Sequence, residues 1–192
     1  SNDGLFGIVA LTMRNFDLTD LPSSFGSLFG EVYRKEAFHG AGQQLDLHIS
    51  PGAEVSYSRA RFYEPDLFGS HYDRWSLDLE YSDRDRRYLA YNEGRTQNKI
   101  EIGRQLSPEL SLFVGLEEKK VHVKGIDPAD TLPDSLLSQP AETELLGALL
   151  NLRYRDLDRR MDPTDGMQLR WRNSIYTSAL GGNTEFVKSH LT

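Results

Sequence analysis

The chain has 192 residues, a formal net charge of −7 and 38% hydrophobic residues, which is enough for one domain with a sizeable core. Its acidic balance argues against nucleic acid as a partner, because nucleic-acid binding requires a basic face. The absence of cysteine excludes disulfides and thiolate metal sites. No apolar run approaches about 18 residues, so a transmembrane helix is excluded. Transmembrane strands are not excluded, because they present an apolar side chain only at every second position.

Alternation of apolar and polar residues with period two is the dominant pattern, and it predicts β-strands. In residues 73–83, for example, Trp75, Leu77 and Leu79 form an apolar row between polar neighbours. Turn signals rich in Pro, Gly and Asp separate these segments, which predicts hairpin connections throughout. The expected fold is therefore an all-β antiparallel meander of about nine strands, at residues 5–14, 43–50, 54–63, 73–83, 96–105, 109–123, 144–157, 166–177 and 183–191.

Two connections are long. Residues 15–39 are rich in Gly, Ser and Phe and predict a short helical or looped insert, whereas residues 124–143 hold three prolines and several acidic residues and predict a long polar loop. We interpret residues 1–3 as a linker or an expression remnant and residues 4–192 as one partial barrel domain. Both ends lie against periodic segments, so we expect the domain to continue in a longer protein.

Alternation alone does not decide whether the apolar face of this sheet lies against a second sheet or against lipid. A soluble β-sandwich would bury the apolar rows against a second sheet, whereas an outer-membrane barrel would turn them towards lipid. The polar rows carry many full charges, which suits a water-filled lumen. Aromatic residues also lie at or near the ends of apolar rows, where interface girdles are expected: Tyr63, Trp75, Tyr81, Tyr154 and Tyr176.

Three motifs carry a family resemblance. A Gly-Ala-Gly-Gln segment precedes a strand and a Pro-Gly turn, an aromatic-acidic-Pro turn follows the next strand, and an acidic strand end precedes a Pro-Thr-Asp-Gly turn. In this order the segments resemble the amino-terminal part of the β-barrel domain of the BamA family of outer-membrane protein assembly factors, the bacterial surface antigen barrel family. We interpret the motif positions as fold determinants, since Gly permits tight turns and Pro ends a strand: Gly40, Gly42, Gln43, Pro51, Gly52, Phe62, Glu64, Pro65, Gly69, Asp158, Pro163 and Gly166.

The resemblance implies a partial outer-membrane β-barrel in the bacterial outer membrane, in contact with the lipid bilayer. It implies that the whole protein assembles and inserts other β-barrel proteins, with unfolded outer-membrane proteins as clients and accessory assembly lipoproteins as partners. A passive pore, a polypeptide-translocating barrel and a soluble β-sandwich binding module are the alternatives. Because an open piece of barrel exposes two strand edges, we expect the chain on its own to self-associate.

The first strand is the candidate for pairing with a client strand, because the family uses its first strand in this way. The matching segment is continuously apolar, which suits an edge that accepts varied partners; an ordinary buried strand explains the same pattern equally well. Its residues are Leu5, Phe6, Gly7, Ile8, Val9, Ala10, Leu11 and Thr12.

Catalytic patterns are weak throughout the chain. The five histidines lack the spacing of a zinc site, and no serine lies in a nucleophile-elbow context. The run from Glu117 to Lys120 is interpreted as a solvated strand end. We therefore expect no enzyme activity, no cofactor and no metal site.

Overall fold

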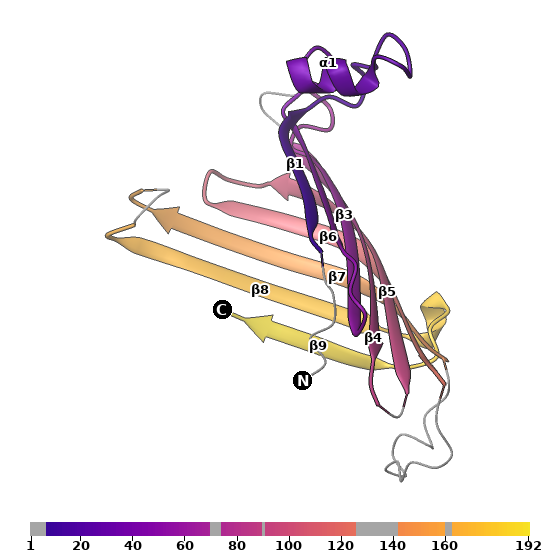
Figure 1. The fold of residues 1–192 in the computed structure, drawn as a ribbon. Helices are drawn as coiled ribbons and strands as arrows, with labels where there is room; N and C mark the ends of the chain where they lie inside the picture. Colours follow the sequence, from indigo (N-terminus) through magenta and orange to yellow (C-terminus); the bar gives the residue numbers. More distant parts are fainter. Residues whose placement is uncertain (1–6, 70–73, 90, 126–141, 160–162) are drawn as a thin grey trace.

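The computed structural model describes residues 7–69, 74–89, 91–125, 142–159 and 163–192, and these form a single antiparallel sheet whose strands follow sequence order (Figure 1). The predicted all-β antiparallel meander is therefore confirmed. A short helix, α1, lies between β1 and β2, and a 3-10 turn, η1, lies between β8 and β9. The elements are β1 (Val9–Phe16), α1 (Leu28–Arg34), β2 (Gln43–Ser50), β3 (Val55–Glu64), β4 (Trp75–Arg87), β5 (Asn92–Gln105), β6 (Leu110–Lys124), β7 (Glu142–Leu157), β8 (Gly166–Tyr176), η1 (Ser178–Leu180) and β9 (Phe186–Leu191).

The observed strand boundaries agree with the predicted ones most closely at β2 and differ from them most at β1, β4 and β5. Strand β1 begins at Val9 rather than residue 5 and continues to Phe16, while Leu5 and Phe6 lie outside the described residues. Strands β4 and β5 extend past the expected hairpin ends to Arg87 and Asn92. The expected linker at residues 1–3 and most of the expected loop, residues 126–141, lie outside the described part of the chain.

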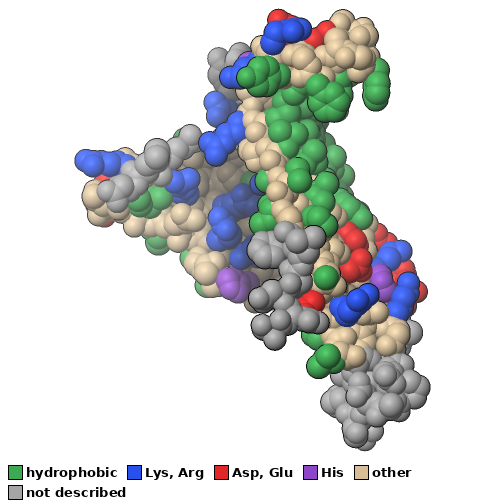
Figure 2. All heavy atoms as spheres, viewed as in Figure 1, with side chains coloured by type: hydrophobic (Ala, Val, Ile, Leu, Met, Phe, Trp, Pro, Cys, Tyr) green, Lys and Arg blue, Asp and Glu red, His purple; other side chains and the backbone are tan. Residues whose placement is uncertain are grey.

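The sheet curls into an open trough, so it has a convex outer face and a concave inner face (Figure 1). Residues paired directly across antiparallel strands share a face, so the register assigns each side chain. Leu79, Ile100 and Leu116 form one outer-face row, and the neighbouring row on the inner face includes Lys99 and Glu117. Figure 2 shows Lys and Arg side chains in the hollow of the sheet and hydrophobic side chains along its outer side.

Burial is inverted relative to a water-soluble protein. Glu117 on the inner face is 7% exposed, while its neighbour Leu116 on the outer face is 54% exposed. Among the described residues, the only buried hydrophobic side chains are Phe16, Ala37 and Tyr176. Soluble proteins bury leucines and expose carboxylates, so this outer face requires an apolar medium.

The aromatic residues expected at interface girdles divide between the two faces. Trp75 and Tyr81 lie on the outer face because they alternate with the polar residues of β4 as Leu79 does, and Tyr154 lies there because it pairs with Leu169. Tyr63 pairs with Asp78, and Tyr176 contacts Glu117, so both lie on the inner face and their predicted girdle position is wrong. The reason is parity: one residue along a strand reverses the face.

The central strands are long enough to cross a bilayer. Strands β4 to β8 contain 13, 14, 15, 16 and 11 residues, whereas a tilted membrane strand needs about 9–11. Neither of the described helices is long and apolar enough to cross a membrane.

Candidate functional site

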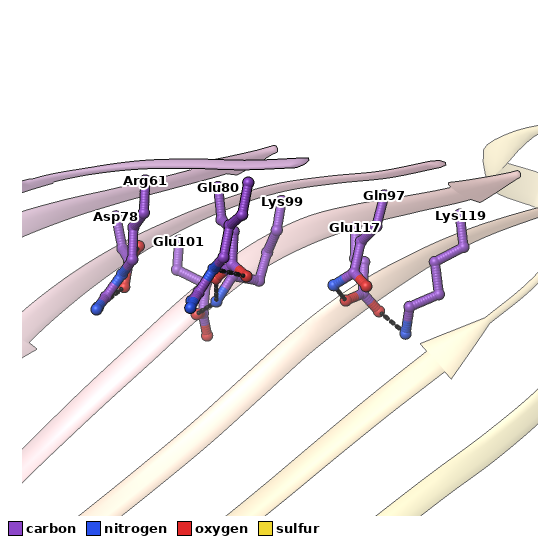
Figure 3. A network of polar contacts seen from close by, with 9 residues as sticks. Arg61, Asp78, Glu80, Gln97, Lys99, Glu101, Glu117 and Lys119 are labelled. Carbon is purple, nitrogen blue, oxygen red and sulfur yellow. Dashed lines mark hydrogen bonds and ion pairs between the residues drawn. The ribbon is translucent and has the colours of Figure 1, made fainter. Parts of the chain in front are cut away.

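The inner face carries a network of charged side chains that runs across β3, β4 and β5 (Figure 3). Arg61 donates two hydrogen bonds to Asp78, from Nε to Oδ1 at 3.0 Å and from Nη2 to Oδ2 at 2.6 Å. Lys99 Nζ lies 3.4 Å from Glu80 Oε2 and 2.9 Å from Glu101 Oε2. The Arg61–Asp78 contact runs diagonally between β3 and β4, Lys99 lies directly opposite Glu80, and Lys99 and Glu101 are neighbours on the same face of β5. Each of these carboxylates therefore has a cation beside it.

The network continues on β6 around Glu117. Gln97 Nε2 donates to Glu117 Oε1 at 2.7 Å, and Lys119 Nζ lies 2.7 Å from Glu117 Oε2 (Figure 3). The hydroxyl of Tyr176 also donates to Glu117, and Lys119 Nζ donates to that hydroxyl at 3.0 Å. Glu117 was expected in a solvated strand end; this is wrong, because it lies mid-strand on the inner face and is nearly enclosed by its partners.

The inner face of β7 and β8 is cationic. Arg153 pairs directly with Arg170, and the adjacent Arg172 pairs with Asn151. Like charges placed directly opposite repel one another. Within the described part of the chain, the Nε atoms of Arg153 and Arg170 are buried without a hydrogen-bond partner. This arginine cluster lines a hollow of about 500 Å³ and leaves that side of the trough with excess positive charge.

The predicted client-pairing segment lies at one end of the sheet. Gly7 and Ile8 precede β1, with the Gly7 amide donating to the Pro51 carbonyl at 3.1 Å. Residues 9–12 lie in β1, which pairs with β2 and with no other strand among the described residues. Val9 is 66% exposed and pairs with Ile49 on the outer face, so pairing with a client strand at this segment stays a prediction.

Five of the family-motif residues converge where β1, β2 and β3 end. Gln43 donates from Nε2 to Glu64 Oε2 at 2.7 Å and accepts from the Leu18 amide at 2.9 Å. Phe62 packs edge-on against the ring of Phe16, with centroids 6.3 Å apart. Gly40 and Gly42 have positive φ angles of 137° and 76°, which suit glycine. We call this group, with Phe16, the junction.

The other motif residues shape three turns. Pro51 and Gly52 lie in the β2–β3 turn, and Pro65 follows the end of β3. Gly69 has a φ of 62° and its amide donates to Asp66 at 3.3 Å. These residues lie in turns and not within the strands, and their role as fold determinants stays a prediction.

The β7–β8 turn is organised by Asp158. Its Oδ1 accepts from the amides of Thr164 and Asp165 at 3.1 and 3.2 Å, and its Oδ2 accepts from the Thr164 hydroxyl at 2.6 Å. These hydrogen bonds hold the pKa of Asp158 below its usual value. Pro163 precedes this turn, and Gly166 opens β8 at a φ of 123°.

Sequence reasoning missed the cluster of Glu117, Lys119 and Tyr176 and the arginine cluster. The available signal was the alternation of side chains along a strand. Glu117 and Lys119 are two residues apart and so share one face, whereas Glu118 between them lies on the other face. Among the described residues, no group of three or more His, Asp or Glu side chains could hold a metal ion.

One curved layer of long antiparallel strands, apolar outside and charged inside, defines a section of transmembrane β-barrel wall. The pattern of the Omp85 superfamily domain matches residues 38–192. The chain belongs to the Omp85 superfamily and is part of an outer-membrane barrel of that family. The predicted resemblance is confirmed, and the alternative of a soluble β-sandwich is wrong.

A solved structure shows the same fold. The chain is similar to BamA from Haemophilus ducreyi lacking POTRA domains 1–3, with a TM-score of 0.55 and 16% sequence identity. The match covers 79% of this chain and 31% of that one, so this chain spans about a third of that protein's length. No curated protein sequence matches the chain.

Proposed function

We propose that this chain is part of a barrel that assembles and inserts other β-barrel proteins into the outer membrane, and that β1 pairs with the client strand. The observation that carries the proposal is the pairing of β1 with β2, whose register shifts between Met13 and Phe16 and so weakens the attachment of the first strand to the sheet. Membership in the Omp85 superfamily and the BamA-like fold support it.

A free strand edge in lipid is a strong acceptor for another strand. Its unpaired N–H and C=O groups find no water in the bilayer core, so an incoming strand that pairs with them is strongly favoured. The hydrogen bonds and burial gained by the client supply the free energy, and no nucleotide is required. Unfolded outer-membrane proteins are the clients that this mechanism requires, with accessory assembly lipoproteins as partners of the whole protein.

Strand β1 has inner-face side chains that suit varied partners. Its inner-face positions Ala10 and Thr12 are small, whereas β9 places Lys188 and His190 on that face. Small side chains leave room for different client residues opposite them. The pairing of β1 with β2 also shifts register between Met13 and Phe16, which weakens that end of the strand.

Single cysteines test the pairing of β1 with a client strand. These 192 residues contain no cysteine, and any cysteine elsewhere in the full-length protein is first replaced by serine. Leu11→Cys in the full-length protein, combined with single cysteines along the last strand of a client, is expected to give disulfide adducts in one register. Val114→Cys is the matched control, because Val114 lies on the outer face of the interior strand β6 and is 48% exposed against 45% for Leu11. Equal adducts at both positions, or none at Leu11, would contradict the proposal.

The arginine cluster favours a second candidate, a barrel that translocates polypeptides, because acidic segments would be attracted to Arg153, Arg170 and Arg172. An assay in reconstituted vesicles distinguishes translocation from assembly. A translocating barrel moves a labelled polypeptide into the vesicle lumen, whereas an assembly factor leaves the client embedded in the bilayer. A passive pore does neither and shows steady conductance.

A further inference from the structure

The connection between β1 and β2, residues 17–42, which we call the insert, exposes three aromatic side chains. Phe25, Phe29 and Tyr33 are 92%, 84% and 89% exposed. Phe29 and Tyr33 are four residues apart in α1, which places them on one side of the helix, and Phe25 lies in the turn just before it. Exposed apolar patches of this kind mark sites of interaction with proteins, membranes or ligands.

The other side of the insert is polar. Glu31 accepts from the Ser23 amide at 2.8 Å, and Arg34 Nε lies 2.8 Å from Glu36 Oε2. Figure 2 shows charged side chains on the upper side of the insert and hydrophobic side chains beneath it, in line with the hydrophobic outer side of the sheet. The insert is therefore amphipathic, and its apolar side continues the outer face.

The orientation of the insert is fixed at its base. Phe38 stacks on Phe16 of β1 with ring centroids 5.4 Å apart, and Ala37 is fully buried beside it. The Asp17 amide donates to the Phe38 carbonyl at 3.1 Å, and the Phe38 amide donates to the Asp20 carbonyl at 2.7 Å. These contacts with Phe16 and Asp17 hold the insert at the end of the β1–β3 wall, while the side chains of Phe25, Phe29 and Tyr33 stay exposed.

We infer that the insert is a membrane-interface anchor, with Phe25, Phe29 and Tyr33 in the boundary between lipid headgroups and acyl chains. Lipid is the occupant because the hydrophobic side of the insert continues the outer face of the sheet and its charged side chains lie on the opposite side (Figure 2). Aromatic rings partition into this boundary, and an amphipathic helix lies in its plane. The anchor would fix the depth of the end of β1, the strand that the proposed function pairs with a client.

Single-cysteine spin labels test the depth directly. The full-length protein carrying Phe29→Cys is reconstituted in vesicles of phosphatidylethanolamine and phosphatidylglycerol, and the label's collisions with oxygen and with a water-soluble nickel complex are measured. Oxygen concentrates in lipid, so the anchor predicts a high oxygen-to-nickel ratio at position 29. Arg34→Cys, on the charged side of the same helix, is the matched control and should show the reverse.

Val114→Cys supplies a reference for the lipid-facing outer face, so position 29 should fall between positions 114 and 34. In a chain that also carries Phe25→Ser and Tyr33→Ser, the label at position 29 should shift towards water while the label at 114 stays at its depth. Equal nickel access at positions 29 and 34 would overturn the inference. Shielding of position 29 from both reagents would also overturn it, because that result indicates a protein partner. Neither measurement depends on client insertion.

Discussion

The hydroxyl of Tyr176 donates a hydrogen bond to Glu117, and this contact joins β8 to β6 across the intervening strand β7. The hydrogen bond can cross β7 because Gly147, the β7 residue that pairs with both Glu117 and Tyr176, has no side chain. A Cβ atom at position 147 would lie 2.7 Å from Cδ1 of the Tyr176 ring. Glu117 is thereby held on the inner face by a partner two strands away.

Tyr176→Phe should destabilise the barrel, because it leaves the nearly buried Glu117 carboxylate short of one hydrogen bond. The expected loss is about 1.5–3 kcal/mol of unfolding free energy, the range for hydrogen bonds to charged groups. Urea titration of the full-length protein in vesicles measures it. Tyr81→Phe, on the outer face, is the control and should change little. Equal effects of the two substitutions would show that the hydroxyl of Tyr176 makes no specific contribution.

Gly147→Val should also be disruptive, since the added side chain occupies the space of the Tyr176 ring. We expect a loss of about 1–3 kcal/mol or more, typical of overpacking. The fraction of folded barrel can be followed by its heat-modifiable migration in gels. Gly26→Ala is the control, because a Cβ atom there meets no atom within 4 Å. Wild-type behaviour of Gly147→Val would rule out the close contact with the ring.

Asp78→Asn should separate the bidentate pair with Arg61 and destabilise the inner face. Asp78 is buried while Arg61 is partly exposed, so solvent screening limits the loss to about 1–3 kcal/mol. A double-mutant cycle with Arg61→Met isolates the pair. Asp85→Asn on the same strand is the control, since Asp85 is exposed and has no ion pair among the described residues. A coupling energy near zero for Arg61 and Asp78 would show that they act independently.

Asp158 makes the β7–β8 turn sensitive to acid. Its pKa is lower in the folded protein than in an unfolded chain because of the bonds from Thr164 and Asp165. The stabilisation is therefore complete above the unfolded pKa and is lost as the pH falls through the folded pKa. Amide exchange of Thr164 and Asp165 should be protected near neutral pH and lose protection in strong acid.

Asp158→Ala should remove that protection at every pH, whereas Asp156→Ala, at an exposed strand position, should leave it intact. Unchanged exchange in Asp158→Ala would mean that backbone pairing alone holds the turn.

The sequence predicted β2 to the residue and the order of all nine strands, because alternation is strong where one face is wholly apolar. It failed at the β4–β5 hairpin. Residues such as Asp83, Arg84 and Asp85 are polar on both faces, so no alternation marks the strand there. Pairing of β4 with β3 and of β5 with β6 extends these strands regardless of their pattern.

The site was less predictable than the fold. Alternation placed charged rows on one face, but it could not show that Arg61 would pair diagonally with Asp78 rather than with its direct neighbour Glu80. The contact between Tyr176 and Glu117 depends on the register of three strands, which a single sequence does not specify. The motif residues were easier to interpret, because Gly42 and Pro65 act through local backbone geometry.

Client insertion is the most direct test of the proposed function. The full-length protein in vesicles, given a urea-denatured outer-membrane protein, should accelerate folding of that client over empty vesicles. The acceleration should disappear when the Leu11→Cys variant is first joined by a disulfide to a cysteine-bearing client strand peptide, and it should persist when the Val114→Cys variant is treated in the same way. An insertion rate equal to that of empty vesicles, together with steady ion conductance in planar bilayers, would contradict the account and identify the barrel as a passive pore.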